Sequence, residues 1–177
     1  MTAEADRMLD PDYLANLEGR SMDEIRAMRD ECVDVETGLS YLRRMVQGPL
    51  DIVKSELQRR AIGGESADRA TLIGDLPAIL ADGPRTPGNG RLLDTIGPTH
   101  LDPALSAELD IIVGHGVIAS LSTLDDDALS ALQRSLSDFE MRVSELRRGS
   151  FERIDVLQAE LIRRYRTGEA TVDGLLT

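Results

Sequence analysis

Two stretches of the chain repeat a hydrophobic position every three or four residues, which is the spacing of one face of an α-helix. The first stretch has Val35, Leu39, Leu42, Val46, Leu50, Val53 and Leu57, and the second has Phe139, Val143, Leu146, Ser150, Ile154, Leu157 and Leu161. The successive spacings are identical, and only Ser150 is polar. The pattern predicts two long helices, over about residues 22–62 and 126–166, that pack stripe against stripe.

Residues that favour helix ends lie at the predicted borders. Ser21 and Glu24 form a capping box before the first helix, and the acidic turn 125–127 precedes the second. A glycine follows the last basic turn of each helix. Pro49 lies inside the first helix, where its missing N–H predicts a kink or a local opening.

The remaining sequence predicts short helices and a linker. Asp10-Pro11 starts a short helix that Gly19 ends, and Asp102-Pro103 starts another. Residues 63–102 are rich in Gly and Pro and predict a flexible linker. The apolar run 109–121 contains two glycines, so it forms either two short helices or a helix and a bend.

A row of polar residues flanks each apolar stripe, one position after it and about 100° round the helix. The first row is Glu36, Ser40, Arg43, Gln47 and Asp51, and the second, 104 positions later, is Glu140, Ser144, Arg147 and Asp155, with Phe151 where the repeat would place Gln. Only an antiparallel pair of helices puts both rows on one side of the contact. We therefore expect an all-α fold: a long antiparallel two-helix coiled coil with short accessory helices and a Gly/Pro-rich linker, in a single helical domain over residues 1–177.

The composition argues against several classes of function. The net charge of −12, with 32 acidic and 20 basic residues, argues against direct DNA binding and favours a basic protein partner. Cys32 is the only cysteine, which excludes an internal disulfide and a cysteine-based metal site. With neither a charged-then-apolar leader nor a long apolar run, the chain is expected to be cytoplasmic and not to enter a membrane.

The residue types of the two rows suit a polar, two-fold symmetric ligand. Arginine binds guanine O6 and N7 through two donors, or a phosphate, and carboxylates accept from the guanine N1–H and N2–H₂ groups. Serine and glutamine add hydrogen bonds to phosphate or ribose. A guanine dinucleotide fits this set, although other symmetric polar molecules fit it as well.

The spacing Glu-x3-Ser-x2-Arg-x3-Gln-x3-Asp, complete at residues 36–51 and returning with one change at 140–155, resembles the cyclic di-GMP signature of the RsiG family of actinobacterial anti-sigma factors. Members of that family hold a cyclic di-GMP dimer on an antiparallel coiled coil and then sequester the sporulation sigma factor WhiG. The resemblance implies that this chain is not an enzyme, needs no metal, and uses both polar rows for the nucleotide. With two motifs in one chain, it also implies that a monomer with internal pseudo-two-fold symmetry binds. Phe151 could offer an apolar face to a base.

Two other functions compete with this one. A structural or adaptor coiled coil would use its polar rows only to fix the register of the helices. An enzyme that cleaves nucleotides would need a metal cluster or a positioned base, and the sequence has no pattern for either. Basic residues outside the rows are interpreted as surface or helix-end charges: Arg44, Arg59, Arg60, Arg148, Arg163 and Arg164.

Overall fold

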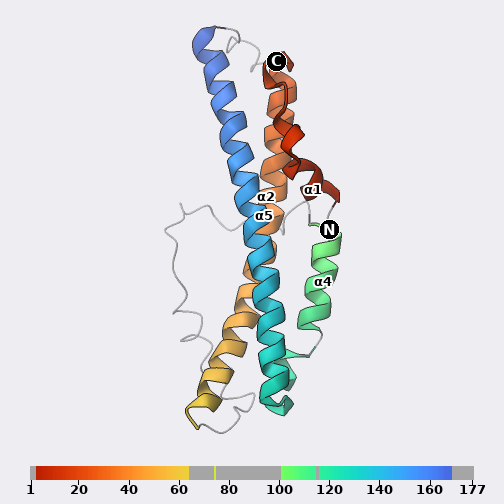
Figure 1. Cartoon of the computed structure of the whole chain (residues 1–177), viewed down its shortest axis with the longest axis vertical. Coiled ribbons are helices and arrows are strands. Elements are labelled where there is room, and N and C mark those ends of the chain that lie inside the picture. The colour runs from red at the N-terminus through yellow and green to blue at the C-terminus, as the bar shows by residue number, and fades with distance from the viewer. Residues whose placement is uncertain (1–2, 64–73, 75–100, 115, 169–177) are drawn as a thin grey trace. The chain divides into compact units, whose positions relative to one another are not determined.

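Two long helices dominate the computed structural model (Figure 1): α2 (Met22–Ala61) and α5 (Asp126–Thr167). The capping box is confirmed, because Ser21 Oγ accepts from Glu24 N at 3.2 Å and Glu24 Oε2 accepts from Ser21 N at 2.6 Å. At the start of α5, Asp125 Oδ1 accepts from Ala128 N at 2.8 Å. Both long helices therefore begin where their capping residues predict.

The structure describes residues 3–63, 74, 101–114 and 116–168. Most of the predicted linker 63–102 lies outside the described residues. Within them, every regular element is a helix and no strand occurs, which confirms the all-α class. None of the helices in these ranges is both long enough and apolar enough to cross a membrane. α2 continues through Pro49 without a break in its helical assignment.

The chain divides into two compact units. Unit 1 consists of Met1–Ser40, Pro98–Asp102 and Ser144–Thr177, and unit 2 consists of Tyr41–Gly97 and Pro103–Val143. Each unit therefore contains one part of α2 and one part of α5.

In unit 1 the two long helices run antiparallel, since Arg26 contacts Tyr165 while Glu36, further along α2, contacts Arg147, earlier in α5. A short helix, α1 (Ala3–Leu9), which the sequence pattern did not predict, packs on them. The core consists of residues from α1, α2 and α5, namely Met8, Ile25, Met28, Cys32, Leu157 and Leu161.

The short helix predicted between residues 10 and 19 is replaced by two 3₁₀ helices, η1 (Pro11–Leu14) and η2 (Leu17–Gly19). Asp10 does cap the first, because its side chain accepts from Asp12 N at 2.8 Å. Asn16, between them, has φ 56°, a left-handed conformation that breaks a continuous helix. The predicted Asp10 cap is confirmed, and the prediction of one short helix is wrong.

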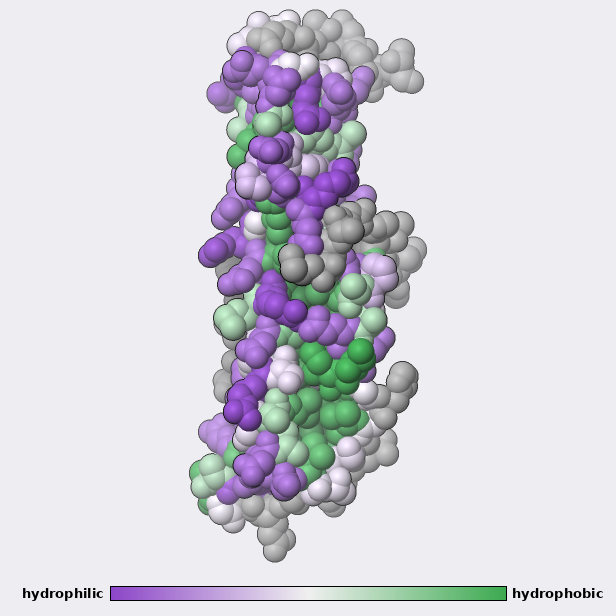
Figure 2. Space-filling model, turned by 45° about the vertical axis from the view of Figure 1, so that its right-hand side comes forward, coloured by the Kyte–Doolittle hydropathy of each residue, from purple (hydrophilic) through white to green (hydrophobic). Residues whose placement is uncertain are grey.

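In unit 2 the long helices are again antiparallel, with Arg43 against Glu140 and Arg60 against Asp126. The predicted helix after residue 102 is confirmed as α4 (Pro103–Val113), and it buries Leu105 and Leu109. A turn and the 3₁₀ helix η3 (Ile118–Thr123) follow, so the apolar run 109–121 is a helix, a turn and a 3₁₀ helix. Apolar side chains gather on one face of unit 2, over α4 (Figure 2). Ile111, which belongs to α4, is 82% exposed.

The 104-residue repeat extends beyond the long helices. Shifted by 104, α1 falls within α4, η2 within η3, and α2 on α5. The capping residues Ser21 and Asp125 differ by the same offset and accept from equivalent backbone N–H groups. Each unit thus repeats one plan, in which a short helix and a 3₁₀ turn precede a long helix.

Candidate functional site

In unit 1, Arg147 on α5 joins two polar residues of α2. Its Nε donates to Glu36 Oε1 at 2.9 Å and to Ser40 Oγ at 2.7 Å, and Ser40 Oγ donates in turn to Glu36 Oε1 at 2.6 Å. The three side chains form a closed hydrogen-bonded triangle. The Arg147 side chain is 33% exposed and that of Glu36 is 16% exposed, so the triangle is reachable from solvent. We call these three residues and Phe151 the Arg147 cluster.

Phe151 completes the cluster. It lies one turn after Arg147 on α5, and the Arg147 guanidinium carbon is 4.8 Å from the centre of its ring. This is the distance of a cation–π contact. The residue that departs from the repeat therefore touches the central arginine of the row.

In unit 2, the equivalent arginine makes the equivalent ion pair. Arg43 Nε on α2 donates to Glu140 Oε1 on α5 at 2.8 Å, and the two side chains are 35% and 22% exposed. We call this the Arg43 pair. Gln47 and Asp51 follow Arg43 on α2, both partly buried, and neither side chain has a hydrogen bond to a described residue.

The remaining predicted residues, Ser144 and Asp155, belong to unit 1. Ser144 is partly buried and Asp155 is exposed. Each arginine thus pairs with a glutamate from the other copy of the motif, since Glu36 belongs to the first copy and Arg147 to the second. The sequence grouped the residues by helix, whereas the ion pairs join residues from both helices in each unit.

This arrangement can bind an anionic or guanine-like group. In both ion pairs the arginine contacts its glutamate through Nε. No described residue accepts a hydrogen bond from Nη1 or Nη2 of Arg147. Those two donors form the edge that arginine uses for two-donor recognition of guanine, carboxylate or phosphate.

A second pair of arginines, Arg60 and Arg164, is also related by the 104-residue offset. Arg164, predicted to be a surface or helix-end charge, is 6% exposed. It donates to Leu17 O and Arg20 O at 2.6 Å each, and to Glu160 Oε1 at 2.7 Å. Arg163 donates to the same carboxylate at 2.8 Å. Arg164 is therefore a helix-end charge, as predicted, but it is buried and not at the surface, and it binds the backbone just before α2.

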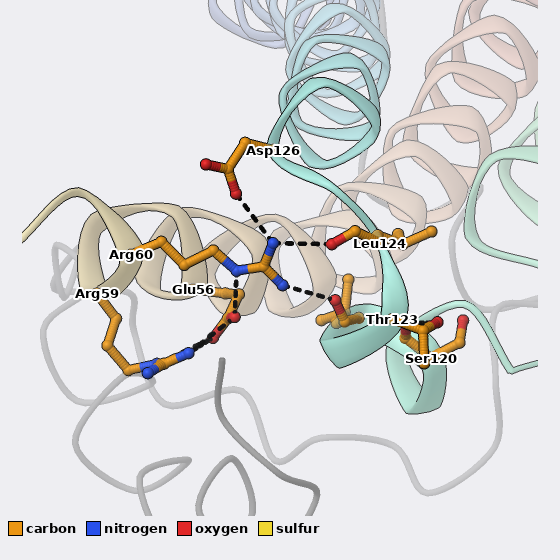
Figure 3. A network of polar contacts seen from close by, with 8 residues as sticks. Glu56, Arg59, Arg60, Ser120, Thr123, Leu124 and Asp126 are labelled. Atoms are coloured by element: carbon orange, nitrogen blue, oxygen red, sulfur yellow. Dashed lines mark hydrogen bonds and ion pairs between the residues drawn. The ribbon is translucent and has the colours of Figure 1, made fainter. Parts of the chain in front are cut away.

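Arg60 makes the matching contacts in unit 2 (Figure 3). It donates to Leu121 O at 3.0 Å and Leu124 O at 2.8 Å, and its Nε donates to Glu56 Oε1 at 2.7 Å. Asp126, at the start of α5, accepts from Arg60 at 2.9 Å. The spacing Glu-x3-Arg at 56–60 and 160–164 was the available signal, but the backbone acceptors cannot be read from it.

The two glutamates of these clusters are held in their charged form. Burial would raise the pKa of Glu56, but hydrogen bonds from Arg60 and Arg59 keep it below its usual value. Hydrogen bonds from Arg163 and Arg164 lower the pKa of Glu160 to about 2. Both carboxylates are therefore ionised at neutral pH and serve to position the arginines.

The ranges that the structure describes contain no group of three or more His, Cys, Asp or Glu residues that could hold a metal ion. A comparison with protein-family models matches residues 11–80 and 117–177 to a family described as RsiG-like. The two matched regions include the described parts of both long helices and both polar rows. No match was found among curated proteins.

Proposed function

This chain belongs to the RsiG-like family, which indicates an anti-sigma factor role, and we propose that it binds cyclic di-GMP. When the nucleotide is bound, the chain sequesters a WhiG-type sigma factor. Under this proposal the nucleotide is a regulatory ligand that binds as a dimer, and the chain has no catalytic role. The outcome is repression of the transcription that the sigma factor directs.

The observation that carries the proposal is the repeated arginine–glutamate contact. Arg43 with Glu140, and Arg147 with Glu36, are related by the 104-residue offset and have nearly equal lengths of 2.8 and 2.9 Å. A ligand with two equivalent halves presents the same groups twice. Cyclic di-GMP has two guanines and two phosphates, so each half can meet the same set of donors and acceptors.

The proposed contacts follow from the residue types. The Nη donors of Arg147 bind a guanine edge or a phosphate, and Arg43 supplies the second guanidinium. The carboxylates of Asp51 and Asp155 accept from guanine N–H groups. Ser40, Ser144 and Gln47 add hydrogen bonds to phosphate or ribose. The existing ion pairs hold the arginines in place before the ligand arrives, which reduces the entropy lost on binding.

The proposed sigma partner fits the charge of the chain. Its net charge of −12 complements a protein that recognises promoter DNA with basic helices. A ligand that binds the sigma-competent form more tightly than the free form shifts the population toward that form. Filling the polar rows with nucleotide supplies this differential binding.

Calorimetric titration with cyclic di-GMP tests the first step. The proposal expects saturable binding and a molar ratio that reports the number of nucleotides per chain, with GMP as a matched control that binds at least tenfold more weakly. Absence of binding by cyclic di-GMP would remove the nucleotide from the account.

One observation supports the alternative function, a structural or adaptor coiled coil whose polar rows only fix the register of the helices. In both units the polar rows already join α2 to α5 through an ion pair, and such pairs can fix the register of two helices without any ligand. That function predicts that replacing Arg43 changes the stability of the helix pair and that no nucleotide binds.

A further inference from the structure

The two polar rows differ in residue type at one place only, where the first row has Gln47 and the second has Phe151. The chain has only two phenylalanines and no tryptophan. Phe139 is fully buried, as expected for a core residue, whereas Phe151 is 40% exposed. Within the described residues, the Phe151 ring makes a cation–π contact with the Arg147 guanidinium.

That contact restricts the Arg147 guanidinium. Its Nε is bonded to Glu36 and Ser40, and its central carbon lies 4.8 Å from the Phe151 ring centre. The ring thus lies against the guanidinium carbon, and Nε is engaged by Glu36 and Ser40. Arg147 Nη1 and Nη2 donate to no described residue, so this edge is the part that a ligand can use.

Building on the proposed function, we propose that Phe151 fixes Arg147 as a platform for one guanine of cyclic di-GMP and makes the Arg147 cluster the tighter of the two sites. A guanine that bonds to the Nη edge meets a cation that is already oriented. Gln47, at the equivalent place beside Arg43, has no ring and cannot hold its neighbour in this way. The two halves of the repeat therefore bind guanine with different affinities.

Three substitutions at position 151 separate the aromatic face from shape and polarity. Phe151→Trp keeps a cation–π partner, and because the chain has no other tryptophan, its fluorescence reports only this site. Phe151→Leu keeps an apolar side chain without a ring, and Phe151→Gln restores the repeat. Glu152→Gln, at an exposed neighbour outside the polar rows, is the matched control.

We expect Phe151→Trp to bind cyclic di-GMP within about twofold of the parent, with tryptophan fluorescence that changes on binding. Phe151→Leu and Phe151→Gln should each weaken binding about fivefold, the size of an exposed cation–π contact. Circular dichroism should show the same helix content in all variants. Glu152→Gln should bind as the parent does.

The outcomes separate the inference from the function on which it rests. If the parent does not bind cyclic di-GMP, both are wrong. If the parent binds and Phe151→Leu binds equally well, or Phe151→Trp is weakened as much as Phe151→Leu, the role of Phe151 is wrong and the proposed function stands.

Discussion

Arg60 and Arg164 lie 104 residues apart and make the same hydrogen bonds, each to a glutamate four residues earlier and to two backbone carbonyls of a 3₁₀ turn. In unit 1 this turn precedes α2, and Arg164 lies on α5. In unit 2 the turn precedes α5, and Arg60 lies on α2. The arginine therefore fixes the position at which one long helix begins against the end of the other. Register along the pair, and with it the meeting of Arg43 with Glu140, depends on such fixed ends.

Replacing Arg164 should destabilise the fold. Arg164→Ala removes donors from two carbonyls and leaves Glu160, 13% exposed, with one partner fewer. We expect a loss of about 2–4 kcal/mol in the free energy of unfolding, because buried acceptors lose charged donors. Urea unfolding followed by circular dichroism measures it.

The neighbouring Arg163 is the control for this substitution. It bonds to the same glutamate but its side chain is 45% exposed, so Arg163→Ala should cost less than about 1 kcal/mol. Equal losses from the two substitutions would contradict the positioning role of Arg164.

The lowered pKa of Glu160 predicts a contribution to acid resistance. Its pKa is about 2 in the folded chain, against a usual value of 4.5. The stability it adds is therefore fully present above pH 4.5 and is lost as the pH falls from 4.5 toward 2. Glu160→Gln should remove this part of the pH dependence. Urea unfolding at a series of pH values compares the two proteins, and parallel curves between pH 2 and 5 would refute the prediction.

Gly149 allows α1 to approach α5. A Cβ added at Gly149 would lie 2.5 Å from Leu9 Cδ2, which is closer than such atoms come. Gly149→Ala should gain helix propensity but must displace Leu9, so we expect no net stabilisation. In a Leu9→Ala background the same change should stabilise by about 0.5–1 kcal/mol. A double-mutant cycle in urea measures the coupling, and additive effects would show that the contact is absent.

Arg147 and Arg43 should each be needed for nucleotide affinity. Charge-assisted hydrogen bonds contribute about 1.5–3 kcal/mol, so Arg147→Ala or Arg43→Ala should weaken cyclic di-GMP binding at least about tenfold. Arg148→Ala is the matched control, because Arg148 is next in sequence and its side chain is 78% exposed. Calorimetry on the three variants checks this, and unchanged affinity in Arg43→Ala would remove that residue from the site.

Much of the fold followed from local signals in the sequence. The stripe of apolar residues gave both long helices, and caps such as Ser21 and Asp125 gave their starts, because these depend on neighbours within one or two turns. The α1 helix was missed: it has only seven residues and depends on packing of Met8 against the long helices. Short helices gain most of their stability from such tertiary contacts.

The sequence predicted which residue types form the site, but only partly which side chains contact one another. Sequence periodicity placed Arg147 and Glu140 in one row, because both lie on α5. It could not show that Arg147 meets Glu36, since the residue opposite depends on register between the helices. Register in turn depends on contacts such as Arg164 with the carbonyls before α2, which join distant parts of the chain. Arg60 and Arg164 are helix-end charges, as predicted, but backbone acceptors carry no sequence signature, so the sequence could not show their contacts with the carbonyls.

The decisive measurement is the affinity of a WhiG-type sigma factor for this protein with and without saturating cyclic di-GMP. We expect sigma to bind at least about tenfold more tightly when the nucleotide is present, and Arg43→Ala to abolish that difference at the same nucleotide concentration. Because coupling is reciprocal, sigma should tighten nucleotide binding by the same factor. A sigma dissociation constant that is identical with and without cyclic di-GMP would contradict the account.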